Sequence, residues 1–135
     1  MTNPPVWLTR PVAMAIHNWL QADHGRDGTL PCDSARLEAV LAGPRELHRD
    51  GTTDVFRLSA RYALGVARDR PFGDGNECAA LALAGVFLAL NGWRLDGSES
   101  DAVSVTRALA SRELDASAYA MWLEEVSRRD SSGTA

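Results

Sequence analysis

The segment 70–78, of sequence RPFGDGNEC, holds most of the residues in this chain that could do chemistry. It leads directly into an apolar stretch that extends to Leu90. The first N–H groups of a helix lack partners and the helix dipole favours negative charge there, so such a junction can bind an anion. Gly73 and Gly75 would let the backbone approach a ligand closely, and Asp74 is placed to bridge a divalent cation to a phosphate. The segment indicates either a phosphate site or an ordinary turn before a helix.

Four side chains near this segment have a chemical and a structural interpretation. Cys78 could be a nucleophile activated by the helix start, but we expect a small core residue. Asp74 could bind a metal or simply cap backbone N–H groups. His17 could be a replacement base, but it falls on an otherwise apolar stretch and is expected to be a packing residue. Arg70 could contact a phosphate or a partner, or lie on the surface.

Composition limits the function classes that remain. A chain of 135 residues predicts one domain, here 1–135, with a core about 8–126 and a frayed tail at 130–135. The net charge of −4 gives no reason to bind nucleic acid or an anionic membrane. The chain contains no lysine, so no lysine can act as a base or contact a phosphate. Two cysteines and no secretory leader favour a cytoplasmic protein.

Capping residues and apolar spacing predict six helices. Thr9 caps the first helix, and a glycine-containing stretch at 24–28 ends it. Residues 29–32 are expected to be extended or to form a short flap. Gly43-Pro44 is expected to end the second. The fifth begins after Ser98. The other ranges are about Ser34–Ala42, Asp54–Arg68, Asn76–Leu90 and Ala116–Arg129.

The helix predicted over Asn76–Leu90 is apolar nearly all round, which is typical of a buried central helix. We expect Leu83, Val86, Phe87 and Leu90 to be nearly fully buried. An all-α domain with this helix at its centre is therefore predicted. The four tryptophans should fill the core or its rim, whereas exposed tryptophan near the 70–78 segment would indicate a partner groove.

The segment and its flanks resemble the Fic/Doc family, and in particular its short death-on-curing branch. That family has the motif His-Pro-Phe-x-Asp/Glu-Gly-Asn-x-Arg between two helices, and Pro71, Phe72, Asp74, Gly75 and Asn76 match it here. The resemblance covers about residues 8–126 and implies the same all-helical fold. Two positions depart from the motif. Arg70 stands where the family has its catalytic histidine, and Cys78 stands where it has a phosphate-binding arginine.

The resemblance implies a nucleotide site with Mg²⁺ as cofactor. ATP or another nucleotide would be held by Phe72, Gly73, Gly75, Asn76 and the residue at position 78, with the metal on Asp74. The family transfers AMP or a phosphoryl group to a protein hydroxyl. Its short members act on a translation factor and are neutralised by a small antitoxin protein.

Three hypotheses follow from this resemblance and its departures. The first is a toxin-family transferase that is impaired because Arg70 has no acceptor atom and stays protonated. The second is an inactive pseudoenzyme that binds a nucleotide or a protein. The third is that Arg70 or Cys78 is not the native residue.

Overall fold

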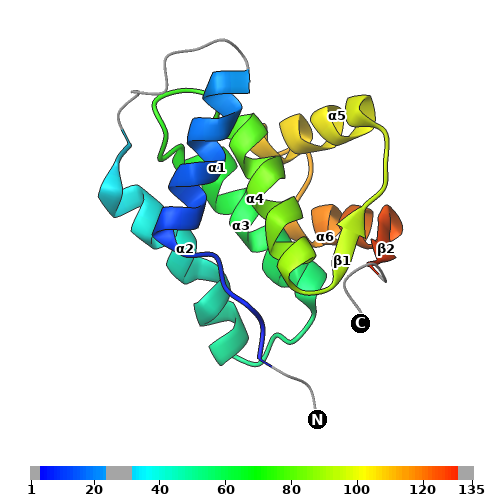
Figure 1. Ribbon diagram of the computed structural model, residues 1–135. Coiled ribbons are helices and arrows are strands. Elements are labelled where there is room, and N and C mark those ends of the chain that lie inside the picture. Colours follow the sequence, from blue (N-terminus) through cyan, green and yellow to red (C-terminus); the bar gives the residue numbers. More distant parts are fainter. Residues whose placement is uncertain (1–3, 24–31, 131–135) are drawn as a thin grey trace.

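The computed structural model describes residues 4–23 and 32–130, which form six helices and a small two-stranded antiparallel sheet (Figure 1). The predicted all-α fold is confirmed. The helices are α1 (Arg10–Asp23), α2 (Ser34–Arg49), α3 (Val55–Asp69), α4 (Asn76–Leu90), α5 (Glu99–Ala110) and α6 (Ala116–Glu125). The strands are β1 (Trp93–Leu95) and β2 (Ser127–Arg129), in a register that opposes Trp93 to Arg129.

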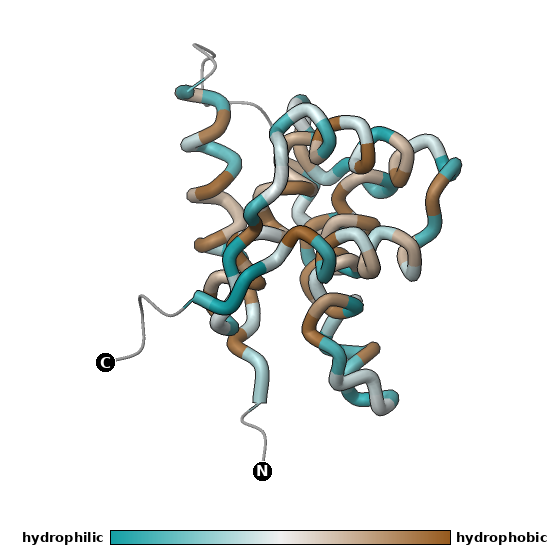
Figure 2. The backbone as a smooth tube through the Cα atoms, turned by 90° about the vertical axis from the view of Figure 1, so that its right-hand side faces the viewer, coloured by the Kyte–Doolittle hydropathy of each residue, from teal (hydrophilic) through white to brown (hydrophobic). Residues whose placement is uncertain are grey.

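α3 and α4 form the centre of the molecule. α3 packs against α2, α4 and α6, while α4 packs against α1, α5 and β1. Most helices start at a capped residue: Asp33, Asp54, Ser98 and Asp115 each accept a hydrogen bond from a backbone N–H in the first turn. Figure 2 shows hydrophobic residues recurring along the helices, as burial of one face requires.

The expectation that α4 is enclosed on every side is only half right. Leu83 and Phe87 are fully buried, as predicted. Val86 is only half-buried and Leu90 is 45% exposed, because the last turn of α4 leads out toward β1. One face of α4 therefore stays partly open between α1 and α5.

The predicted end of the second helix at Gly43-Pro44 is wrong, because α2 continues through Pro44 to Arg49. Proline inside a helix removes one hydrogen bond and costs about 3 kcal/mol. Here Gly43 and Pro44 are both buried, and a Cβ on Gly43 would lie 3.1 Å from the Arg61 side chain of α3. Packing against α3 thus outweighs the local preference to stop.

The last predicted helix is also too long. α6 ends at Glu125, and Ser127–Arg129 instead pair with β1. The Arg129 guanidinium lies over the Trp93 ring at 4.7 Å, which favours the pairing of β2 with β1 over another helical turn. The expectations for residues 24–31 and for 131–135 lie outside the described residues. Among the described residues, no helix is long and apolar enough to cross a bilayer.

Candidate functional site

The 70–75 segment is a loop that joins α3 to α4 and is tied to the start of α2. The Pro71 carbonyl accepts a hydrogen bond from the Asp33 N–H at 2.7 Å, and Cys32 forms an isolated antiparallel bridge with Phe72. Burial raises the pKa of the Cys32 thiol, and nearby Arg10 opposes that shift only in part. Cys32 is therefore a neutral packing residue of this junction.

The loop is closed on itself by Asn76. Its Oδ1 accepts from the Phe72 N–H at 3.1 Å, and its Nδ2 donates to the Phe72 carbonyl at 2.8 Å. Both residues are buried. A buried backbone group without a partner is costly, so these two bonds fix the loop in one shape.

His17 and Gln21 of α1 form the floor beneath the loop. The His17 ring stacks on Phe72 with 4.1 Å between ring centroids. His17 Nε2 lies 2.9 Å from the Asp74 carbonyl oxygen, and Gln21 Nε2 donates to the same oxygen at 3.2 Å and lies 2.9 Å from His17 Nε2. His17 is 2% exposed. Its stacking on Phe72 and its contact with Asp74 agree with the expected packing role, and the ring also borders a cavity beside the loop.

The start of α4 differs from the helix starts that are capped by a side chain. Its first flanking residue is Gly75, in the left-handed conformation (φ 74°), and no side chain caps the helix. The Gly75 N–H binds the Asp74 carboxylate at 2.8 Å, and a Cβ at Gly75 would lie 3.3 Å from the Gln21 amide. The N–H groups of the first turn of α4 thus remain available to an anion.

A small cavity of about 250 Å³ gathers most of the predicted site residues around this helix start. Phe72 lies beneath it, and Gly73 lies exposed outside its lining. The expectation that Cys78 is a core residue is wrong: it is exposed on the first turn of α4, where the helix turns that position away from α3. The predicted residues that line the cavity are Arg70, Asp74, Gly75, Asn76 and Cys78.

Asp74 caps the Gly75 N–H, which agrees with its structural interpretation. Within residues 4–23 and 32–130, no group of three or more acidic, histidine or cysteine side chains could hold a metal ion. Mg²⁺ often binds through only one or two carboxylates together with phosphate oxygens. Asp74 therefore fits a metal that arrives with a phosphate, and not a metal cage formed by the protein alone.

Arg70 adopts an unusual backbone conformation. It is the C-cap of α3 with φ 50° and ψ 61°, a left-handed conformation that costs a residue with a Cβ about 1–2 kcal/mol. Its N–H still binds the Val66 carbonyl at 3.1 Å. The position favours glycine, yet an arginine occupies it.

Sequence reasoning did not single out two residues of the site, Gln21 and Arg107. Gln21 lies four residues after His17, and this spacing would have placed both on one face of α1. Arg107 of α5 forms an ion pair with Glu77 at 3.7 Å. This contact joins residues 30 positions apart, and no local pattern indicates it.

An apolar groove of about 390 Å³ runs beside the cavity, between α1, α4 and α5. Trp19 is 65% exposed there, and Val103 faces it from α5. Leu81 and Ala82 line its floor on the open face of α4. The exposed tryptophan lies next to the 70–78 segment, the arrangement expected of a partner groove.

Comparisons with known proteins agree with this geometry. A model of the Fic/DOC family matches residues 7–88, which include α1 to α3, the loop and all but the end of α4. The protein kinase doc of Escherichia phage P1 is 32% identical over 116 residues, which cover 84% of this chain and 89% of that protein.

Proposed function

The chain belongs to the Fic/DOC family, and from that premise we propose that it is a Doc-like protein of a toxin–antitoxin system. Its inherited activity is the nucleotide-dependent transfer of a phosphoryl or AMP group to a protein hydroxyl, and in this chain that transfer is impaired. The observation that carries the proposal is that the loop keeps the residues that would bind a phosphate but lacks those that would catalyse transfer. Asn76, Phe72 and the uncapped start of α4 form an intact anion site, while Arg70 and Cys78 lack the groups needed for catalysis.

The residues present fit a nucleotide phosphate. The first turn of α4 offers backbone N–H groups, and Gly75 presents no side chain that would keep a phosphate away from them. A larger residue there would also crowd Gln21, since a Cβ at this position would lie 3.3 Å from its amide. When bound, Mg²⁺ would neutralise phosphate charge, with Asp74 as its protein ligand. A cytoplasmic setting, where free thiols persist, is part of the proposal.

Transfer requires a side chain that accepts the proton of the target hydroxyl. The guanidinium of Arg70 has no acceptor atom and stays protonated. Loss of a general base costs about 10²–10⁴-fold in rate. Cys78 offers no cation for the phosphates, so binding of the reacting group is weakened as well.

The test is label transfer from α- and γ-labelled ATP to a purified translation factor. We expect no useful transfer by this chain and little by Arg70→His or Cys78→Arg alone. The double variant should recover more than the sum of the two. Adding Asp74→Ala to the double variant is the matched control and should abolish the recovery. Robust transfer by the unaltered chain would refute the impairment.

The alternative function is a pseudoenzyme that binds a nucleotide or a protein. The apolar groove with exposed Trp19 favours it, since such a surface fits an amphipathic helix of a small antitoxin. Under this alternative the chain binds MgATP or the antitoxin, and the double variant still transfers nothing. Trp19→Ala should then weaken antitoxin binding without lowering stability.

A further inference from the structure

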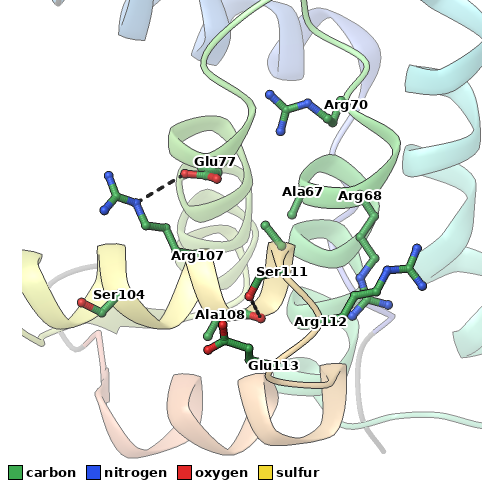
Figure 3. Close-up of a pocket in the computed structure, with 11 residues that line it drawn as sticks. Ala67, Arg68, Arg70, Glu77, Ser104, Arg107, Ala108, Ser111, Arg112 and Glu113 are labelled. Atoms are coloured by element: carbon green, nitrogen blue, oxygen red, sulfur yellow. Dashed lines mark hydrogen bonds and ion pairs between the residues drawn. The ribbon is translucent and has the colours of Figure 1, made fainter.

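A second and larger cavity, of about 660 Å³, opens on the other side of Arg70 (Figure 3). It lies between the ends of α3 and α5 and the first turn of α4. Its charged lining consists of four arginines and two glutamates, a net charge of +2 in a chain of net charge −4. These residues are Arg68, Arg70, Arg107, Arg112, Glu77 and Glu113.

Only one of the four arginines forms an ion pair with a residue of the lining. Glu77 pairs with Arg107 at 3.7 Å, which leaves Arg68, Arg70 and Arg112 against the single charge of Glu113 in the lining. Arg68 Nη2 donates to the Leu109 carbonyl at 3.4 Å, but its Nε is buried and has no hydrogen-bond partner. Among the described residues, the Arg70 and Arg112 guanidiniums make no hydrogen bond or ion pair. A buried donor without a partner and two unpaired cations beside a cavity are the groups that an anion would satisfy.

The backbone singles out the same two residues. Across the part of the chain that the structure describes, Arg70 (φ 50°) and Arg112 (φ 71°) are the non-glycine residues with positive φ, and both line this cavity. Each follows the end of a helix, where a cation gains from the helix dipole. An arginine one residue earlier in the chain would interact with the helix dipole equally well and would have an unstrained backbone. The dipole therefore does not explain why arginine occupies a position that favours glycine.

The two cavities meet at Arg70 and Glu77, which line both. An anion that starts at the uncapped end of α4 can therefore extend into the arginine-lined cavity. This continuity also compensates for Cys78, which leaves α4 without a cation of its own at the helix start.

We propose that the arginine-lined cavity binds a phosphate chain, and that Arg70 and Arg112, with Arg68, supply the cations that position 78 does not. The planar guanidinium binds phosphate oxygens in pairs, which suits a di- or triphosphate group. The identification of this ligand as a nucleotide, instead of free polyphosphate, rests on the proposed function. The proposal that the cavity binds a phosphate chain does not depend on that function.

The test is isothermal titration calorimetry of the full chain with sodium tripolyphosphate in EDTA, so that no metal takes part. Arg112→Gln removes one cation from the cavity, and Arg94→Gln on β1 is the matched control, since Arg94 is exposed and lies outside the lining. We expect Arg112→Gln to weaken binding about tenfold or more and Arg94→Gln less than about twofold. Equal losses, or no binding by the parent at millimolar tripolyphosphate, would overturn the proposal.

A second variant separates binding from folding. Arg112→Gly removes the same cation and relieves the left-handed strain, so it should lose affinity while its Tm stays the same or rises. A fall in Tm together with the loss of affinity would mean that Arg112 is structural.

Repeating the titration with ATP separates the two proposals. If tripolyphosphate binds and ATP does not, the anion site stands and the nucleotide function fails. If ATP binds with an affinity that Arg112→Gln leaves unchanged, the nucleotide function stands and the arginine-lined cavity is not its phosphate site.

Discussion

The two faces of the 70–78 segment differ in both burial and chemistry. The inner face consists of Phe72, whose ring stacks on His17, and Asn76, and both are nearly inaccessible to solvent. The outer face carries Arg70, Asp74 and Cys78, all of them exposed. The inner face keeps the family's residues, whereas both departures from the motif lie on the outer face.

This difference indicates that shape and chemistry are separable here. The loop is held by the Asn76 hydrogen bonds and by stacking on His17, and neither depends on residue 70 or 78. Changes on the outer face should therefore alter ligand binding and catalysis but barely alter stability. Changes on the inner face and the core beneath it should do the opposite.

The largest effect is expected in the core, toward the C-terminal end of α4. Phe87 is fully buried in α4 and contacts Trp7 and Tyr62. Phe87→Ala should lower the free energy of unfolding by about 3–5 kcal/mol, because the cavity cannot fully collapse. Leu90→Ala, at an exposed position of the same helix, is the control and should cost far less. Urea unfolding measures both, and similar losses would show that α4 is not central.

The next largest effect is expected at Asn76. Asn76→Ala leaves the buried N–H and carbonyl of Phe72 without partners, and should cost about 2–4 kcal/mol. Asn18→Ala, on the exposed side of α1, controls for the loss of an amide and should change stability by less than about 0.5 kcal/mol. Equal unfolding midpoints for the two variants would remove the distinction between inner and outer faces.

Asp74 should separate binding from stability. Asp74→Ala is expected to weaken MgATP binding by more than about tenfold, because the metal loses its protein ligand. The cost in stability should stay below about 1 kcal/mol, since the hydrogen bond to the Gly75 N–H is an exposed one. Calorimetry measures the MgATP affinity, and thermal unfolding measures the stability. Unchanged affinity would make Asp74 a backbone cap alone; Asp50→Ala, at the exposed end of α2, controls for the charge.

The smallest effect on stability is expected from the double variant Arg70→His with Cys78→Arg. Both side chains are exposed, so the free energy of unfolding should stay within about 0.5 kcal/mol of the parent. The same variant should give the largest gain in label transfer. A loss of stability above about 2 kcal/mol would show that the outer face also supports the fold.

Local signals explain which parts of this structure the sequence could predict. The second, third, fifth and sixth helices begin at or within one residue of the expected positions, and Asn76–Leu90 has the predicted bounds, because capping and apolar spacing act within one element. The predicted conformations at Pro44 and at Ser127–Arg129 are wrong because contacts with segments distant in sequence decide them. Packing on α3 keeps the chain helical at Pro44, and pairing with β1 makes Ser127–Arg129 a strand.

The candidate site divides in the same way. The motif placed Phe72, Asp74, Gly75 and Asn76 on one loop, since adjacent residues must lie together. It gave no indication that Arg107 and Arg112 of the α5 region line the same cavity as Arg70. That arrangement depends on how α5 packs on α4, and the left-handed backbone of Arg70 and Arg112 has no local signal in the sequence.

The two bonds from Asn76 to Phe72 also make that part of the loop measurable without any ligand or substrate. The Phe72 amide hydrogen is buried and hydrogen-bonded to Asn76, whose side chain closes the loop. This amide can therefore exchange with deuterium only when the loop opens and that hydrogen bond breaks. Its protection factor reports the opening equilibrium of the loop. Native-state exchange at this single amide would therefore register whether an occupant of the outer face holds the loop shut.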